Sequence, residues 1–286
     1  MNKKLKIIIA SSLTFLAAIF PQKISHAQVQ ETIIRRELIM VGVRGDSPWF
    51  GFRNEGKWTG YCIDIAYALA ERLSANQLDP IRVRLVTSTT QSRWDLVTSG
   101  RVDLECGPNS ISPEREAKHG ISFSLPFFIT ATQILAKKGR EEEDVKVGNA
   151  TVGVVRDTAN ERDLKSAYPL EKIDNKYSSR EQGVQALVDG EVSGFASDGT
   201  LLLGSAEIMN LDTEEDYSLI TINQENGRPF CASYGFILPG GEDNSSWQRY
   251  VNNFLANNKK AQRIRKKWLG DLSENSQRLY DACTQE

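Results

Sequence analysis

The stretch VDLECGPNSISPER, residues 102–115, holds the pattern that decides the fold. Its first five residues are apolar at alternate positions, as in a buried strand, and Ser112 followed by Pro113 is typical of a helix start. A strand that leads through a short loop into a helix is the repeating unit of an α/β protein. Free backbone N–H groups at the start of that helix, beside Arg115, predict an anion site at the carboxyl edge of the sheet.

The same alternation extends on both sides of this stretch. Upstream, the pattern predicts strands at residues 38–43, 81–86 and 102–106 and helices at 61–74 and 91–98. After a polar stretch at 137–144 it predicts strands at 151–155 and 192–197 and helices at 159–167, 183–187 and 201–209. After a second polar stretch at 223–228 it predicts a strand at 233–238 and helices at 247–256 and 260–268. We therefore expect an α/β protein of two lobes, with the final segment completing the first lobe.

Two lobes joined by two polar connections leave a cleft, which is the usual place for a small ligand. In the second lobe, Thr158 and Glu161 form the pattern of a capping box directly after the 151–155 strand. This helix N-terminus is a second place for an anion. Each helix start taken alone is more typical of a well-capped helix with no ligand, but two of them after strands in separate lobes shift the balance toward an anionic ligand.

Charge, histidine content and motifs exclude several classes of function. The 286 residues carry 35 Lys and Arg against 37 Asp and Glu, so the chain has no basic excess with which to hold a nucleic acid. Only His26 and His119 occur, which excludes a His-rich zinc site. G-x-S-x-G, P-loop, G-x-G-x-x-G and H-E-x-x-H motifs are absent from the sequence. We therefore predict no catalytic residues, no metal and no cofactor.

The first 27 residues have the features of a secretory signal peptide. Lys3, Lys4 and Lys6 precede an apolar run at residues 7–20, which falls short of the roughly 20 residues that span a bilayer. Small residues at alternate positions predict cleavage after Ala27, and no Cys follows to accept a lipid. We expect an exported, soluble, monomeric protein, with a membrane anchor as the alternative.

The four cysteines, Cys62, Cys106, Cys231 and Cys283, all lie in the exported part, where an oxidising compartment favours disulfides. Three pairings are possible, and the spacing does not choose among them. We favour Cys62 with Cys106 and Cys231 with Cys283. Buried free thiols are the alternative for the first pair.

Several motifs resemble those of the extracytoplasmic amino-acid-binding proteins of ABC importers, over nearly the whole exported chain. GYCID at 60–64 and FASD at 195–198 are similar to motifs of the wider family, whereas ECG at 105–107 before Arg115 and TTQSR at 89–93 are similar to the glutamate/aspartate-binding subgroup. The resemblance implies a two-lobed, type II periplasmic-binding-protein fold, with two hinge crossovers and a ligand cleft between the lobes. We expect a signal peptide at 1–27, a first lobe at 28–138 and 228–286, a second lobe at 139–227, and hinges at the polar stretches 137–144 and 223–228.

The resemblance also assigns contacts to the ligand's α-amino-acid groups. Arg115, assisted by Ser110, would grip the α-carboxylate, and Thr158 with the N–H groups after it would close on the same carboxylate. Asp198 would take the α-ammonium. The chemistry agrees, because a zwitterion presents a planar anion and a compact cation, which a guanidinium fork and a carboxylate match.

A second carboxylate on the ligand would require a second cationic cluster, because an unpaired buried charge costs several kcal/mol. The resemblance places Arg44, Arg93 and Arg180 where the subgroup faces that carboxylate, and Trp49 where an aromatic ring covers the aliphatic part of the ligand. For each arginine the alternative is a solvated surface charge, and for Trp49 it is an ordinary core position.

Two departures from the family pattern leave the ligand open among glutamate, aspartate, glutamine and asparagine. RDTA stands at 156–159 where the family commonly has S-G-T-T or S-G-T-G, and Pro108 removes an N–H near Arg115. The implied function is capture of a polar, acidic L-amino acid in the periplasm by hinge closure, and its delivery to the membrane permease of an ABC importer. The alternative is a dehydratase-like enzyme that acts on a small carboxylate, with Glu105 or Asp198 as acid or base.

Overall fold

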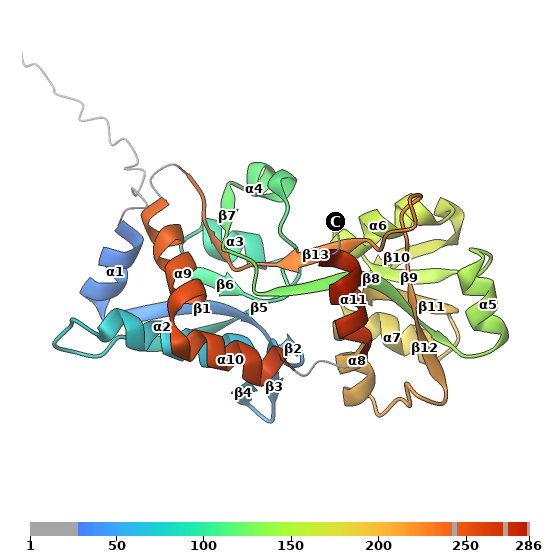
Figure 1. Cartoon of the computed structure of the whole chain (residues 1–286), viewed down its shortest axis with the longest axis horizontal. Coiled ribbons are helices and arrows are strands. Elements are labelled where there is room, and N and C mark those ends of the chain that lie inside the picture. Colours follow the sequence, from blue (N-terminus) through green and yellow to red (C-terminus); the bar gives the residue numbers. More distant parts are fainter. Residues whose placement is uncertain (1–27, 242–244, 271–273, 285–286) are drawn as a thin grey trace, which may run out of the picture.

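Two lobes, each built around its own β-sheet, make up the chain (Figure 1). The structure is a computed structural model that describes residues 28–241, 245–270 and 274–284. The two-lobed α/β architecture predicted from the sequence is confirmed. The predicted signal peptide, residues 1–27, lies outside the described residues.

The first sheet has five strands in the order β5-β1-β6-β14-β7. These strands are β1 (Leu38–Arg44), β5 (Arg82–Ser88), β6 (Leu104–Cys106), β7 (Ile121–Phe123) and β14 (Ile237–Pro239). β5 and β6 both pair with β1 in parallel, with Arg44 opposite Ser88 and Val43 opposite Cys106. Their carboxyl ends therefore meet at one edge of the sheet, where open α/β sheets bind ligands.

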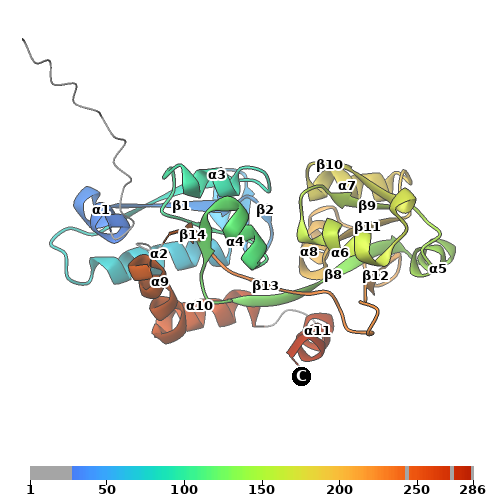
Figure 2. The same cartoon turned by 90° about the horizontal axis from the view of Figure 1, so that it is seen from above.

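Helices cover both faces of this sheet (Figure 2). α2 (Tyr61–Ser74), α9 (Ser245–Asn257) and α10 (Lys259–Leu269) share one apolar core with β1, and α3 (Arg93–Thr98) packs in a second, smaller core. Ile65, Leu69 and Leu73 of α2 are buried at every fourth residue, which gives the helix one apolar face. Each such side chain contributes about 1.5–3 kcal/mol by its burial.

Three shorter elements complete the first lobe: α1 (Gln28–Arg36), α4 (Pro113–His119) and a small sheet of β2 (Asp46–Ser47), β3 (Gly51–Asn54) and β4 (Lys57–Thr59). Trp247 of α9 is fully buried, and its indole N–H donates to the Asp103 carbonyl at 3.1 Å. The final segment up to α10 therefore packs in the core of the first lobe.

The second sheet has the order β10-β9-β11-β8-β12, with β13 also paired to β8. Its strands are β8 (Phe128–Lys137), β9 (Val152–Val155), β10 (Ile173–Tyr177), β11 (Gly194–Asp198), β12 (Tyr217–Thr221) and β13 (Cys231–Tyr234). The helices of this lobe are α5 (Arg140–Lys146), α6 (Ala159–Ala167), the 3-10 turn η1 (Leu170–Lys172), α7 (Arg180–Val188) and α8 (Gly199–Ile208). β10, β9 and β11 are parallel, so this sheet also has a shared carboxyl edge.

β8 carries the chain from the first lobe into the second (Figure 1). Residues 128–131 pair with β13, whereas residues 132–137 pair with β11 and β12 in the second sheet. The connection therefore lies earlier than residues 137–144, where the polar composition placed a hinge. Lys137 pairs with Tyr217 within the second sheet, and α5 begins at Arg140. The polar residues lie at the exposed start of a helix. The predicted lobe boundary at residue 138 assigned residues 132–137 to the first lobe, whereas these residues pair within the second sheet.

The return connection also differs from the predicted single strand at 233–238. The structure has two strands there, because β13 pairs with β8 while β14 pairs with β6 and β7 in the first sheet. Gly235 and Phe236 lie between them. The polar stretch at 223–228 forms a turn before β13, closed by a bridge between Asn223 and Pro229.

Both favoured disulfides are confirmed: Cys62–Cys106 joins α2 to β6, and Cys231–Cys283 joins β13 to α11 (Glu274–Thr284). α11 lies below the connecting strands in Figure 2 and packs against β8. The last helix therefore lies at the junction of the lobes and does not join the core of the first lobe.

Candidate functional site

A cavity lies between the two carboxyl edges and is lined by residues of both lobes. Seven of the residues that the sequence put forward line it: Arg44, Arg93, Ser110 and Arg115 from the first lobe and Thr158, Arg180 and Asp198 from the second. The other lining residues are Thr90, Pro108, Val155, Ala159, Asn160, Ala196, Ser197 and Leu201.

Arg44 and Arg93 form the inner wall on the first-lobe side. Arg44 ends β1 and Arg93 begins α3, and both side chains are buried. Arg44 Nη2 donates to Asp46 Oδ2 at 2.7 Å. The Nε atoms of both arginines are buried and have no hydrogen-bond partner within the described part of the chain. Buried donors of this kind are costly to leave unpaired, so they favour an anionic ligand in the cavity.

Arg115 is held at the mouth of the same wall by the loop before α4. Ser112 caps the helix by accepting from the Arg115 N–H, and Arg115 Nη1 donates to the Ser110 carbonyl at 3.1 Å. Its guanidinium carbon lies 5.7 Å from the ring centre of Trp94, and that of Arg93 lies 4.4 Å from the same ring. The indole thus holds both guanidinium groups over one aromatic surface.

Thr158 lies opposite, at the N-cap of α6. Its hydroxyl donates to the Val155 carbonyl at 2.7 Å and accepts from the Glu161 N–H at 3.2 Å. The hydroxyl proton is therefore used within the lobe. The N–H groups of Ala159 and Asn160, in the first helical turn, have no carbonyl one turn earlier to bind, so they are the donors that this helix offers to an anion.

Asp198 ends β11 and is buried at the second carboxyl edge. Asn160 Nδ2 donates to its Oδ1 at 3.2 Å and also to Thr132 Oγ1 at 3.0 Å. Burial raises the pKa of Asp198, and the hydrogen bond from Asn160 opposes the rise. Asn160 was missed as a site residue, although it lies inside the capping motif, because its contact with Asp198 joins segments that are 38 positions apart.

Arg180 connects the two lobes directly. It begins α7, and its Nη1 donates to the carbonyl of Asp46 in the first lobe at 3.0 Å, while Nε donates to Ser197 Oγ at 3.4 Å. A second bond between the lobes runs from Gln91 Nε2 to the Ser178 carbonyl at 3.0 Å. The lobes are therefore in contact around the cavity.

The cavity is rich in positive charge. Burial and repulsion from Arg44 and Arg115 lower the pKa of Arg93 to about 9, which leaves it protonated at neutral pH. Loss of water would raise the pKa of Asp46, but Arg44 and Arg180 outweigh this and lower it to about 2. Asp46 thus stays ionised, and the arrangement suits a ligand that brings negative charge of its own.

Trp49 does not line the cavity. It lies between β2 and β3 with a φ of 64°, and its ring is so close to Gly204 of α8 that a Cβ added there would lie 3.0 Å from Trp49 Cζ3. The structure therefore places Trp49 where the lobes touch. The apolar part of the cavity lining comes from Val155 and Leu201, among others, which the sequence analysis did not identify.

The departures at 156–159 do not disturb the site. Arg156 is exposed and donates to the Lys176 carbonyl at 3.0 Å. Asp157 takes the left-handed conformation, with a φ of 60°, and its N–H donates to Glu161 Oε2 at 2.7 Å. Asp is one of the few residues that tolerate this conformation, so the turn keeps its shape without glycine.

Within 28–241, 245–270 and 274–284, no group of three or more His, Cys, Asp and Glu is placed to hold a metal ion. In the same ranges, no helix combines the length and the hydropathy needed to cross a membrane.

Comparison with known proteins agrees with this geometry. Residues 39–271 match the family of bacterial extracellular solute-binding proteins, family 3. The glutamate/aspartate import solute-binding protein of Escherichia coli K12 is 29% identical over 180 residues, which span 61% of this chain and 59% of that relative. The chain thus matches less than two thirds of the relative's length.

Solved structures resemble the whole two-lobed chain. A substrate-binding protein of an ABC uptake transporter from Streptococcus pneumoniae, with bound histidine, has a TM-score of 0.70 at 19% identity and covers 84% of this chain and 95% of its own. An ancestral amino-acid-binding protein, described as a precursor of cyclohexadienyl dehydratase, has a TM-score of 0.67 at 22% identity, with 84% and 98% covered. At these identities the likeness concerns the fold.

Proposed function

Because the chain belongs to the bacterial extracellular solute-binding proteins of family 3, and has the type II periplasmic-binding-protein fold, we propose that it captures an acidic amino acid, glutamate or aspartate. One observation carries this proposal: four buried or half-buried arginines and Asp198 line a single cavity. In this proposal Asp198 binds the α-ammonium and Arg115 binds the α-carboxylate. Arg44, Arg93 and Arg180 then remain to bind a second carboxylate.

Capture then proceeds without chemical change to the ligand. Arg115, Arg93 and Arg44 receive the amino acid on the first lobe, and the second lobe closes over it by movement at β8 and β13. Closure brings Asp198 and the first turn of α6 to the ligand and forms the bond from Arg180 to Asp46. Contacts that exist only in the closed form shift the lobes toward that form when ligand is present.

The wider setting follows from the same proposal. We place the protein in the periplasm, exported by residues 1–27, as a monomer that hands its amino acid to the membrane permease of an ABC importer. The relative from Escherichia coli is an import solute-binding protein, which supports this placement. The structurally similar precursor of cyclohexadienyl dehydratase is itself described as an amino-acid-binding protein, which favours binding over catalysis.

A thermal-unfolding screen against the common amino acids tests the proposal. Glutamate or aspartate at 100 times its Kd should stabilise the folded protein by about 2.7 kcal/mol, because it binds only that state. For a domain of this size the midpoint should rise by about 5–10 °C. Mass spectrometry of the recovered ligand should show it unchanged. A screen in which no amino acid raises the midpoint, or in which the ligand returns altered, contradicts the proposal.

The change Arg93→Met tests the assignment of the second carboxylate. The thioether keeps the length and apolar volume of the stem but removes the charge, so glutamate should bind about 100-fold more weakly while glutamine changes little. Isothermal titration of both ligands measures the two effects. Arg101→Met is the matched control, because Arg101 is 59% exposed and pairs with Asp95 on the surface. Equal losses for glutamate and glutamine would remove Arg93 from the selectivity assignment.

A further inference from the structure

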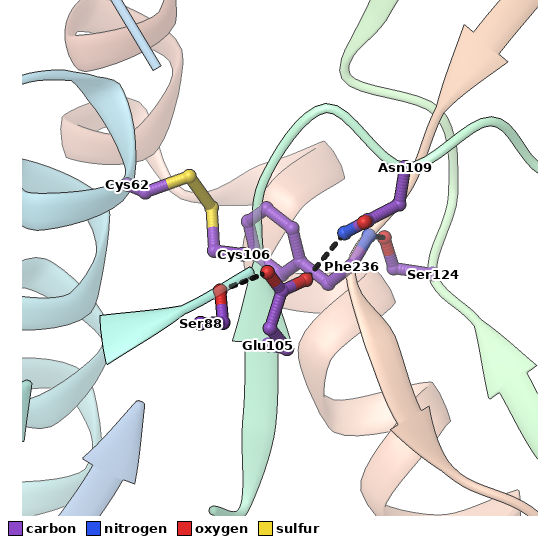
Figure 3. The surroundings of a disulfide bond; sticks show 7 residues. All are labelled: Cys62, Ser88, Glu105, Cys106, Asn109, Ser124 and Phe236. Atoms are coloured by element: carbon purple, nitrogen blue, oxygen red, sulfur yellow. Dashed lines mark hydrogen bonds between the residues drawn. A yellow bond between two sulfur atoms is a disulfide. The ribbon is translucent and has the colours of Figure 1, made fainter. Parts of the chain in front are cut away.

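Glu105 is a fully buried carboxylate beside the site that none of the contacts above uses. It lies in the middle of β6, next to Cys106 of the Cys62–Cys106 disulfide, and its carboxylate faces Ser88 and Asn109 (Figure 3). Ser88 Oγ donates to its Oε1 at 2.6 Å, and Asn109 Nδ2 donates to its Oε2. Both carboxylate oxygens are therefore held in place, and the side chain does not line the cavity.

Two glycines create the space that Glu105 occupies. A Cβ at Gly42 would lie 2.8 Å from Glu105 Cγ, and a Cβ at Gly107 would lie 2.9 Å from Glu105 Oε1. The same Cβ at Gly107 would lie 2.7 Å from Cγ of Arg44. A single methyl group would thus touch both side chains, so the carboxylate lies close to the stem of Arg44, which lines the cavity. The glycines permit this approach, since any other residue there would push the two apart.

The charges around the cavity show what this position can do. Arg44, Arg93, Arg115 and Arg180 supply four positive charges, and Asp46, Glu105 and Asp198 supply three negative ones. One net positive charge remains among these groups. A zwitterionic amino acid with an ionised acidic side chain carries one net negative charge, whereas the corresponding amide carries none. With Glu105 ionised, the net charge of these groups is therefore +1, which the net charge of −1 on an acidic amino acid neutralises.

We propose that Glu105 is a charge-setting and positioning residue: without touching the ligand, it offsets Arg44 and Arg93 and thereby limits how strongly the cavity prefers acidic over amide side chains. The inference rests on the proposed function, since it concerns selectivity among ligands of that same cavity. Its consequence is specific. Removal of this one negative charge should make the cavity more selective for glutamate, whereas loss of a purely structural carboxylate should weaken all ligands together.

The change Glu105→Gln tests the proposal with little change in shape. Asn109 Oδ1 has no hydrogen-bond partner within the described residues, so its side-chain amide can rotate and accept from the new amide at position 105. The ratio of the Kd for glutamine to the Kd for glutamate should rise at least about tenfold, because removal of one buried negative charge removes its repulsion of the second carboxylate. Titration calorimetry of both ligands on the variant and the unaltered protein gives the ratio.

Asp103→Asn is the matched control. Asp103 is also a buried carboxylate, two positions earlier, but it pairs with Arg36 and accepts from the Met40 N–H, away from the cavity. This variant should leave the ratio unchanged. If Glu105→Gln leaves the ratio unchanged, or weakens both ligands by the same factor, the proposal is overturned while the proposed function stands. If the unaltered protein binds neither ligand, both proposals fail.

A pH series on the unaltered protein and on Glu105→Gln offers a second test of the same charge. Burial raises the pKa of Glu105, while Ser88, Arg44, Asn109 and Arg93, the polar and charged groups that face it, oppose the rise. As the pH falls toward the raised pKa of Glu105, uptake of a proton there should increase the same ratio, at pH values where the side chain of glutamate is still ionised.

Because His119 stacks on Trp94 beside Arg93, the series uses His119→Gln to remove its charge. Asp198 also takes up a proton as the pH falls, and its charge acts on the second carboxylate as well. The same series on Glu105→Gln therefore supplies the background. A smaller rise in that variant than in the unaltered protein supports the proposal, and a rise of the same size in both overturns it.

Discussion

Arg115→Ala should weaken the binding of glutamate and of glutamine by the same large factor, about a thousandfold. The arginine is assigned to the α-carboxylate, which both ligands carry, and truncation of one partner of a buried charge pair costs 2–5 kcal/mol or more. The Ser110 carbonyl and the Trp94 ring hold the guanidinium in place, so the unaltered protein loses little side-chain entropy when it binds. Titration calorimetry with both amino acids measures the loss.

Two further variants sharpen this test. Arg115→Lys keeps the charge but loses the planar fork, and should bind both ligands with an intermediate affinity. Arg162→Ala removes a nearby arginine that pairs with Asp163 and does not line the cavity, and should change the affinity only a few-fold. If glutamine binds Arg115→Ala as tightly as it binds the unaltered protein, the α-carboxylate is held elsewhere.

Local signals in the sequence predicted much of the fold and of the site. α2 and α6 have the bounds that their apolar spacing and capping residues indicated, because these signals act within a few residues of the chain. Arg44, Arg115 and Asp198 meet in one cavity because each follows the carboxyl end of a strand. Parallel pairing brings such ends to one edge whatever their separation in sequence.

Contacts between distant segments set the limit of that reasoning. A polar stretch such as 137–144 has the same composition whether it is a hinge or the exposed start of a helix, and only the pairing of Lys137 with Tyr217 distinguishes the two. Trp49 stands in a turn whose partner, Gly204, comes from the other lobe. Its position thus depends on how the lobes meet, which the turn sequence does not encode.

The change Asp198→Asn should weaken every amino acid by at least about a hundredfold, because the α-ammonium loses its buried counter-charge. Its effect on the ligand-free protein should have the opposite sign. Burial raises the pKa of Asp198 in the folded state, so any stability linked to its proton is present at low pH and is lost as the pH rises through the folded pKa. At neutral pH the ionised carboxylate therefore costs folding free energy, and the amide should melt at the same temperature or higher.

The pH dependence of ligand binding tests the role of Asp198 independently of the melting temperature. The ammonium binds the ionised form, so ligand binding should release protons as the pH falls toward the raised pKa of Asp198, and the affinity should fall with it. Calorimetry in buffers of different ionisation enthalpy counts those protons, and the count should vanish in Asp198→Asn. If the variant both binds normally and melts lower, Asp198 supports the fold. Weaker binding together with unchanged or higher melting is expected only of a charge that is kept buried, at a cost in stability, for the ligand.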